Sequence, residues 1–191
     1  MPDDYCFTVG EQGQSGLALL DACFNDYTEY FLKKHGLKPG MHVIDIGCGL
    51  GCMTQIIAKI VGKSGKVIAI DSNANQINAA IKNTPSSLKE IIEYQMHDIN
   101  ALDQFKHTFD YAYCRFVLHH LTQPRRALKA IVNVLKPNGL YVGIEGVMNY
   151  AYSYPEHPAW KTPNFSIHIK EGEGRNPNIG KILPHIMEPV G

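Results

Sequence analysis

Three glycines on alternate positions follow an apolar run, and this arrangement constrains the fold more than any other feature of the chain. The stretch reads Val43-Ile44-Asp45-Ile46-Gly47-Cys48-Gly49-Leu50-Gly51, and helix-forming sequence comes directly after it. Backbone without Cβ atoms can approach a ligand closely, and the first turn of a helix offers free N–H groups and a partial positive charge. The stretch therefore predicts a ligand-binding turn at the carboxyl end of a first strand.

The spacing of these glycines separates two kinds of nucleotide site. A dinucleotide fingerprint is GxGxxG, and Cys52 stands where its third glycine would fall. The run instead resembles motif I (DxGxGxG) of the class I S-adenosylmethionine (AdoMet) methyltransferases, with Asp45, Gly47, Gly49 and Gly51 at its positions. The resemblance implies that these residues bind the methionine half of AdoMet, and a carboxylate suits a cationic sulfonium better than a pyrophosphate. A plain strand-to-helix connection is the alternative.

Composition limits the partners. The chain has 191 residues, with 18 Lys plus Arg against 18 Asp plus Glu, so it has no basic excess for nucleic acid or an anionic membrane. We therefore expect a small-molecule partner, no nucleic acid and no membrane. The chain opens Met1-Pro2-Asp3-Asp4 without a signal-peptide pattern, and no apolar run approaches the ~20 residues of a membrane span. These features predict a cytoplasmic protein.

The cysteines predict free thiols and no metal site. Their number, five, is odd in a chain without an export signal. Cys48 and Cys52 lack the second pair of ligands that a zinc site needs, so small-residue packing explains them better.

Alternating strand and helix patterns predict an α/β fold with three layers. Strands are predicted at 41–46, 65–71, 91–96, 109–114 and 140–146, and helices at 15–35, 53–61, near 77–81, at 124–135 and near 182–187. The resemblance implies a Rossmann-like methyltransferase fold with strand order 3-2-1-4-5. We expect one domain over 1–191, with a lid helix at 1–36, an AdoMet-binding core at 37–147 and acceptor-side loops with a short helix at 148–191.

Further cofactor residues follow from strand ends. Asp71 ends the second strand, and a carboxylate there can accept hydrogen bonds from both ribose hydroxyls of a nucleoside, although it can also cap the next helix. The resemblance adds Ser72 beside it, and it places Asp98 at the adenine amino group and Ile99 against the adenine ring. Asp98 as a simple turn cap is the alternative. Arg115, at the end of the fourth strand, belongs to the segment that faces cofactor and acceptor in this family.

The predicted function is AdoMet-dependent methyl transfer to a small-molecule acceptor by in-line displacement, without a metal or a covalent nucleophile. His119 and His120 are the nearest bases by position for an acceptor that loses a proton, and they can equally be structural. The segment Cys114-Arg115-Phe116-Val117 lacks the Asn/Asp-Pro-Pro-aromatic motif of enzymes that methylate base amino groups. An AdoMet sensor or scaffold without turnover is the alternative, and a nicotinamide-dependent oxidoreductase is a third.

The segment after the fifth strand is rich in aromatic residues and proline, which indicates either an acceptor pocket or packing on the sheet edge. Its members are Tyr150, Tyr152, Tyr154, Pro155, Pro158, Trp160, Pro163 and Phe165. The resemblance implies a seven-stranded sheet, yet no alternating apolar run remains for a final antiparallel hairpin. We therefore expect the fifth strand to lie at an unpaired edge, either because the chain is truncated or because a partner covers this edge, and we expect homodimerisation through it.

Overall fold

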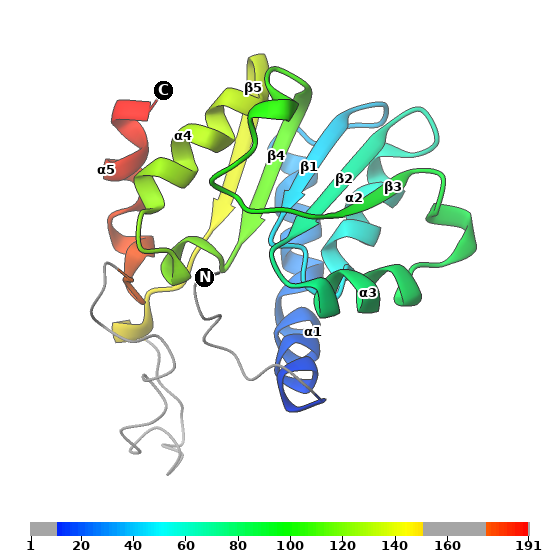
Figure 1. The fold of residues 1–191 in the computed structure, drawn as a ribbon, viewed down its shortest axis with the longest axis horizontal. Helices are drawn as coiled ribbons and strands as arrows, with labels where there is room; N and C mark the ends of the chain where they lie inside the picture. The colour runs from blue at the N-terminus through cyan, green and yellow to red at the C-terminus, as the bar shows by residue number, and fades with distance from the viewer. Residues whose placement is uncertain (1–10, 151–174, 191) are drawn as a thin grey trace.

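The computed structural model describes residues 11–150 and 175–190 and contains a five-stranded parallel sheet between helices (Figure 1). The strands are β1 (His42–Ile46), β2 (Lys66–Asp71), β3 (Ile92–Met96), β4 (Phe109–Arg115) and β5 (Leu135–Ile144). Their order in the sheet is β3-β2-β1-β4-β5, and every neighbouring pair is parallel. The predicted fold class and strand order are confirmed.

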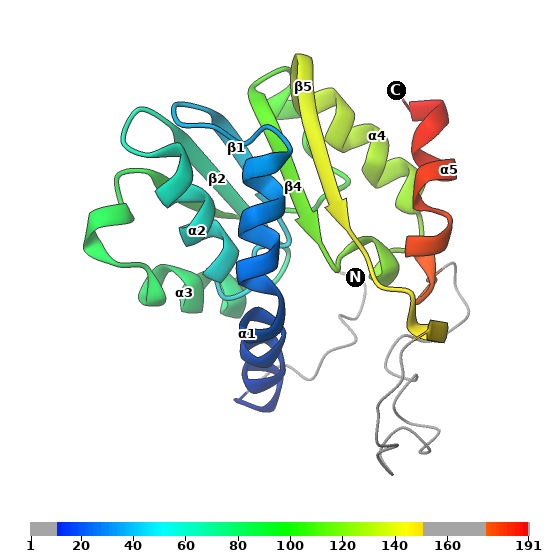
Figure 2. The same ribbon diagram turned by 180° about the vertical axis from the view of Figure 1, so that it is seen from behind.

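Helices cover both faces of this sheet. They are α1 (Glu11–Lys34), α2 (Cys52–Val61), α3 (Ala74–Asn83), α4 (Pro124–Val134) and α5 (Leu183–Met187). α1 and α2 lie in front of the sheet in Figure 2, whereas α4 lies in front of it in Figure 1, with α5 beside α4. Because the strands are parallel, all their carboxyl ends reach one edge of the sheet, where the turns that follow them meet.

β1 shows how the sheet builds two cores. Val43 belongs to the hydrophobic cluster that contains Ile57 of α2, and Ile44 belongs to the other cluster, which contains Leu128 of α4. A parallel strand covered on both faces has no solvent side, so its sequence is apolar nearly throughout. Asp45 interrupts this run and is nevertheless buried, which marks it as a residue that packing alone does not explain.

Two helix ends follow common capping chemistry. Gly36 has a φ of 97°, and the Leu37 N–H donates to the Leu32 carbonyl at 3.0 Å, which closes α1 with a Schellman-type turn. Pro124 is the first residue of α4, where its missing N–H costs nothing. The helix expected over 15–35 begins earlier, at Glu11.

β5 begins earlier than the sequence predicts. Leu135 pairs with Phe109, the chain then bulges through a turn in which Asn138 has a φ of 65°, and pairing resumes at Leu140 with Tyr111. The turn expected at 136–139 therefore lies within β5 rather than before it. Asparagine tolerates the left-handed conformation there without a glycine.

β5 forms one edge of the sheet within residues 11–150 and 175–190. Tyr150 is exposed, and the rest of the aromatic segment lies in 151–174, outside the described residues, as does most of the stretch that a final hairpin would occupy. In the described ranges no helix is both long enough and apolar enough to span a membrane. Cys23, Cys48, Cys52 and Cys114 are free thiols, as expected.

Candidate functional site

The three glycines of the turn after β1 all adopt the left-handed conformation, with φ of 72° at Gly47, 53° at Gly49 and 79° at Gly51. A side chain in this conformation costs of the order of 1–3 kcal/mol. A Cβ on Gly47 would also lie 2.2 Å from a methyl group of Val117, whereas a Cβ on Gly49 would meet no atom within 4 Å. The turn therefore has open space beside Gly49, where a ligand can approach the backbone.

Asp71, the last residue of β2, binds this turn directly. Its Oδ2 accepts a hydrogen bond from the Gly49 N–H at 3.0 Å, and its Oδ1 accepts one from the Asn73 N–H at 2.9 Å. Burial raises the pKa of Asp71, and backbone N–H groups oppose that rise. Asn73, and not Asp71, is the N-cap of α3, because its own side chain accepts from the first helical turn. Asp71 is thus a carboxylate held in a fixed orientation beside the turn.

Asp45 lies at the end of β1 with only 2% of its surface exposed. The Thr54 hydroxyl donates to its Oδ2 at 2.5 Å. Burial raises the pKa of Asp45 to about 6, the Thr54 hydrogen bond and the charge of Arg115 oppose the rise, and nearby carboxylates add to it. Among the described residues no cation forms a salt bridge with Asp45. Such a carboxyl favours a ligand with a positive charge, because that charge would stabilise the ionised form.

Arg115, the last residue of β4, connects the site to α1. Its guanidinium donates to Asp21 at 2.7 Å, to Asn25 at 3.0 Å and to Thr28 at 3.3 Å. The Arg115 and Asp21 side chains are only 9% and 18% exposed. This contact holds α1 across the carboxyl edge of the sheet, next to the turn after β1.

His119 and Glu145 form a buried pair on the other half of the site. The Nδ1 of His119 lies 2.6 Å from Oε2 of Glu145, and their side chains are 9% and 1% exposed. Oε1 of Glu145 accepts hydrogen bonds from the N–H groups of Val117, at 3.0 Å, and Leu118, at 2.7 Å. A carboxylate bonded in this way keeps the proton of His119 on Nδ1, so that Nε2 carries the lone pair.

His120 differs from His119 although the two rings are 3.9 Å apart. Burial lowers the pKa of His120 to about 3, with His119 and Arg175 adding to the effect. A group with so low a pKa is neutral at pH 7 and accepts a proton poorly. The geometry therefore favours His119 over His120 as a base. The later segment packs on this turn, since Asn176 N–H donates to the His119 carbonyl at 3.3 Å.

Phe116 has a φ of 58°, which is rare for a bulky residue. Its N–H donates to the Ile144 carbonyl at 2.9 Å, and its ring packs edge-on against Phe24 of α1 with centroids 5.6 Å apart. The left-handed residue reverses the chain directly after β4. The next two N–H groups thereby reach Glu145, so the strained residue sets the geometry of the His119–Glu145 pair.

The remaining expected residues lie apart from these groups. Asp98 is exposed, and its Oδ1 accepts from the Asn100 N–H at 2.8 Å, so it caps a turn as the structural alternative states. Ile99 is buried in the core on the α4 side, and Ser72 is exposed after β2. The structure places Asp98 and Ile99 after β3 without a hydrogen bond from Asp98 to the glycine turn.

Sequence reasoning missed two residues, Glu145 and Thr54. Glu145 follows β5 directly, and Thr54 lies in the first turn of α2. A carboxylate at a strand end is a signal that sequence reasoning used for Asp71 and could have used for Glu145. Thr54 gives no comparable signal, because its partner depends on how α2 packs on β1. No group of three or more His, Cys, Asp or Glu side chains within 11–150 and 175–190 is arranged to bind a metal ion.

Comparison with protein families finds a match over residues 37–166 to a family described as a methyltransferase domain. Among curated proteins, a demethylmenaquinone methyltransferase of Lactococcus lactis is 31% identical over 152 residues, which cover 80% of this chain and 56% of that protein. A ubiquinone biosynthesis O-methyltransferase of Coxiella burnetii is 33% identical over 109 residues, covering 57% of this chain and 45% of that protein. The chain spans about half the length of the curated relatives it matches.

Solved structures agree with the fold. A SAM-dependent methyltransferase from Aquifex aeolicus is 35% identical, with a TM-score of 0.52 over 57% of this chain and 58% of that chain. An arsenic(III) S-adenosylmethionine methyltransferase from Chlamydomonas reinhardtii has a TM-score of 0.61 at 22% identity, over 80% of this chain and 52% of that chain. At that identity the second likeness concerns the fold alone.

Proposed function

Because the chain belongs to the AdoMet-dependent methyltransferase family, we propose that it transfers a methyl group from AdoMet to a small-molecule acceptor by in-line displacement. The observation that carries this proposal is the glycine turn with Asp71 bound to it: three left-handed glycines, open space at Gly49 and an oriented carboxylate at the next strand. AdoMet supplies a methyl group already activated by the sulfonium charge. The protein then mainly has to align the acceptor and exclude water.

We assign the cofactor contacts to groups that fit them. The turn from Gly47 to Gly51 would hold the methionine half, and Asp71 would bind the ribose hydroxyls, with Ser72 beside it. Asp45 has the burial and the raised pKa of a group that a cationic ligand would ionise. For Asp98 and Ile99 the adenine role rests on the resemblance and on their position after β3.

On the acceptor side, we assign His119 as the proton acceptor and Glu145 as the group that orients it. An acceptor hydroxyl must lose its proton when its oxygen takes the methyl group, and an imidazole with a free Nε2 can accept that proton. Hydroxylated aromatic molecules are the acceptor class that we propose. The similarity to a protein named as an O-methyltransferase supports this choice.

The proposal also includes a lid, a homodimer and a cellular location. α1 would act as a lid, because Arg115 fastens it over the strand ends. The exposed Leu140 on edge strand β5 would support a homodimer, which size-exclusion chromatography with light scattering tests. The free thiols support a cytoplasmic location.

One experiment separates the hypotheses. The protein is titrated with AdoMet by calorimetry and then incubated with AdoMet and a panel of catechols and quinols, with S-adenosylhomocysteine as the readout. We expect binding and turnover with at least one member. Binding without turnover over the whole panel would favour a sensor. Failure to bind AdoMet, especially with a thermal shift caused by NAD instead, would contradict the proposal.

A further inference from the structure

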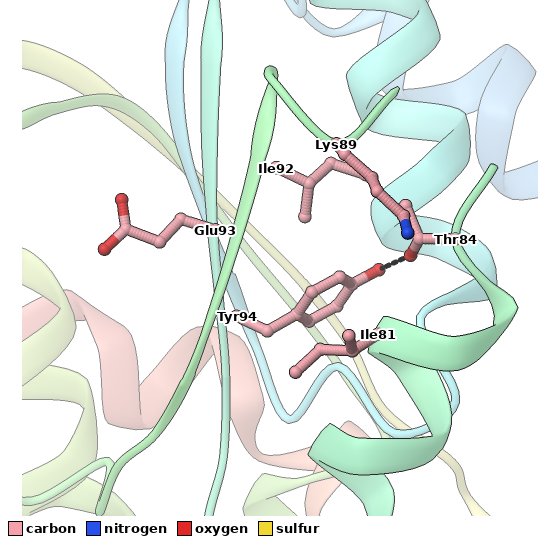
Figure 3. Close-up of a pocket in the computed structure, with 6 residues that line it drawn as sticks. All are labelled: Ile81, Thr84, Lys89, Ile92, Glu93 and Tyr94. Atoms are coloured by element: carbon pink, nitrogen blue, oxygen red, sulfur yellow. Dashed lines mark hydrogen bonds between the residues drawn. The ribbon is translucent and has the colours of Figure 1, made fainter. Parts of the chain in front are cut away.

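A cavity of about 310 Å³ lies between α3 and β3, at the outer edge of the sheet. It is lined by Ile81, Thr84, Lys89, Ile92, Glu93 and Tyr94 (Figure 3). This volume lies at the lower end of the range of small-molecule sites, about 300–1,000 Å³. The site and function described above make no use of this cavity.

The walls of the cavity are apolar. Ile92 and Tyr94 alternate with Glu93 along β3, so they share the face that turns toward α3, where Ile81 lies opposite them (Figure 3). Ile81 is 46% exposed although it is a large apolar side chain. The Tyr94 and Thr84 hydroxyls are 2.9 Å apart, and Thr84 also donates to the Ala80 carbonyl at 2.7 Å. These polar atoms satisfy each other, so the walls offer a ligand mainly apolar contact.

The charge at the cavity comes from Lys89. Figure 3 shows the Lys89 side chain beside Thr84 on the cavity side of β3, whereas Glu93 points to the opposite side of the strand. Glu93 is paired with Lys66 at 3.5 Å and accepts from Gln95 at 2.8 Å. Among the described residues, the Lys89 ammonium has no hydrogen-bond or ion-pair partner. An apolar wall with one unpaired cation fits an amphipathic anion.

We propose that this cavity is a second ligand site, which takes a small aromatic or short-chain carboxylate with its carboxylate at Lys89 and its apolar part against Ile81, Ile92 and the Tyr94 ring. Binding in this cavity does not require the cofactor to be present. An aromatic acid buries apolar surface that is now exposed at Ile81, and its carboxylate gains the ammonium that no protein group uses.

Tyr94 connects this site to the glycine turn. A Cβ on Gly51 would lie 2.6 Å from the Tyr94 hydroxyl, so that hydroxyl packs directly against the turn. Burial raises the pKa of Tyr94 to about 12, and the phenol remains a neutral hydrogen-bonding group. A ligand that moves the ring changes the packing at Gly51, and therefore the affinity of the turn for AdoMet. This consequence rests on the proposed function, whereas binding in the cavity does not.

The test uses benzoate as the probe and benzamide as its neutral match, with ¹H–¹⁵N chemical shifts of the full chain recorded without AdoMet. We expect saturable shifts at the cavity residues with benzoate and weaker binding of benzamide. Lys89→Met keeps the length of the side chain and removes the charge, so it should weaken benzoate about fivefold and leave benzamide nearly unchanged. Ile81→Trp should fill the cavity and abolish binding of both probes.

Unchanged benzoate affinity in Lys89→Met, or saturable shifts confined to the glycine turn, would overturn the proposed site. Lys89 and Ile81 are partly or fully exposed, and a melting curve of each variant confirms that it folds. The link to the turn is tested separately by AdoMet calorimetry with and without saturating benzoate. We expect a change of AdoMet affinity in the parent protein that shrinks in Tyr94→Phe; equal affinities in the parent would remove the link and leave the site.

Discussion

Each half of the site contains one buried carboxyl group, but the two groups have different partners. In the half formed by β1 and β2, the buried Asp45 carboxyl has a raised pKa and no salt bridge within the described residues. In the half formed by β4 and β5, the buried Glu145 carboxylate receives two backbone N–H groups and His119. The Asp45 carboxyl therefore lacks a positively charged salt-bridge partner among the described residues, whereas the Glu145 carboxylate has all of its partners within the fold. Burial alone therefore does not determine what a carboxyl group does; its hydrogen-bond and ion-pair partners determine it.

The largest effect is expected from Gly47→Ala, because Gly47 touches both halves. Its Cβ would lie 2.2 Å from Val117 at a φ of 72°, so strain and overpacking should together cost several kcal/mol of stability and abolish AdoMet binding. Chemical denaturation and calorimetry measure both.

Two matched variants sharpen this prediction. Adding Val117→Ala should recover the part of the loss that comes from the clash, since the strain at φ remains. Gly49→Ala, whose Cβ meets no atom within 4 Å, should cost only the strain while still weakening AdoMet. Equal stability losses in Gly47→Ala and Gly49→Ala would show that the clash of the added Cβ with Val117 costs nothing beyond the backbone strain.

The next effect concerns only the half formed by β4 and β5, which we call the acceptor half because we propose that it serves the methyl acceptor. Glu145→Gln keeps the shape but places an amide against the Nδ1 of His119, which disfavours the tautomer with a free Nε2. We expect kcat to fall on the order of 100-fold or more for a hydroxyl acceptor, while AdoMet affinity stays within twofold. His119→Gln should behave alike, and a much larger effect of His120→Gln would reverse the assignment between the two histidines.

Asp71→Ala tests the half formed by β1 and β2, which we call the cofactor half because we propose that it binds AdoMet. We expect a smaller effect from this substitution than from Glu145→Gln. Loss of a carboxylate with two hydrogen bonds to ribose should weaken AdoMet by about 2–3 kcal/mol, or roughly 30- to 150-fold. Calorimetry on Asp71→Ala and Asp71→Asn gives the value. Because Asp71 also accepts from Gly49 and Asn73, the melting temperature should be compared first. An affinity equal to that of the parent would refute the ribose assignment.

The smallest effect is a pH dependence that only the cofactor half should show. Asp45 has a pKa of about 6 in the fold against 3.8 as its ordinary value, so it is protonated below that range and ionised above it. AdoMet affinity should therefore rise up to about tenfold per pH unit as the pH approaches 6 and level off above it. Asp45→Asn should flatten this profile.

The stability of the fold should change with pH in the opposite direction to the AdoMet affinity. A raised pKa means that protonated Asp45 stabilises the fold below pH 3.8, and that this contribution is lost as the pH rises through 6. Asp45→Asn should therefore raise the melting temperature at pH 7 while it weakens AdoMet. A lower melting temperature together with a pH-independent affinity in the parent would contradict the role given to Asp45.

The same contrast explains how far the sequence could predict the molecule. The cofactor half rests on local signals: an apolar strand, glycines at positions of positive φ, and a carboxylate at the next strand end. The helix ends at Gly36 and Pro124 also depend on a few neighbouring residues, whereas the strand order was implied by the resemblance to the methyltransferase family. Asp98 as a turn cap was predicted as an alternative and is what its hydrogen bonds show.

The acceptor half depends on register instead. Arg115 pairs with Ile144, which places Glu145 opposite Phe116 and the N–H groups that follow it. No pattern in either segment gives that register, and the bulge at the start of β5 changes it further. The left-handed Phe116 is equally hidden, because only its surroundings hold a bulky residue in that conformation.

The contact between Arg115 and α1 has a consequence for how this protein can vary. Asp21, Asn25 and Thr28 lie four and then three positions apart, so they face one side of the helix and reach a single guanidinium. Inserting or deleting one residue between them rotates part of the helix by about 100° and moves its polar groups away from Arg115. Substitutions along α1 are therefore far easier to accommodate than changes in its length. The spacing D-x-x-x-N-x-x-T matches three helix side chains to the single guanidinium of Arg115.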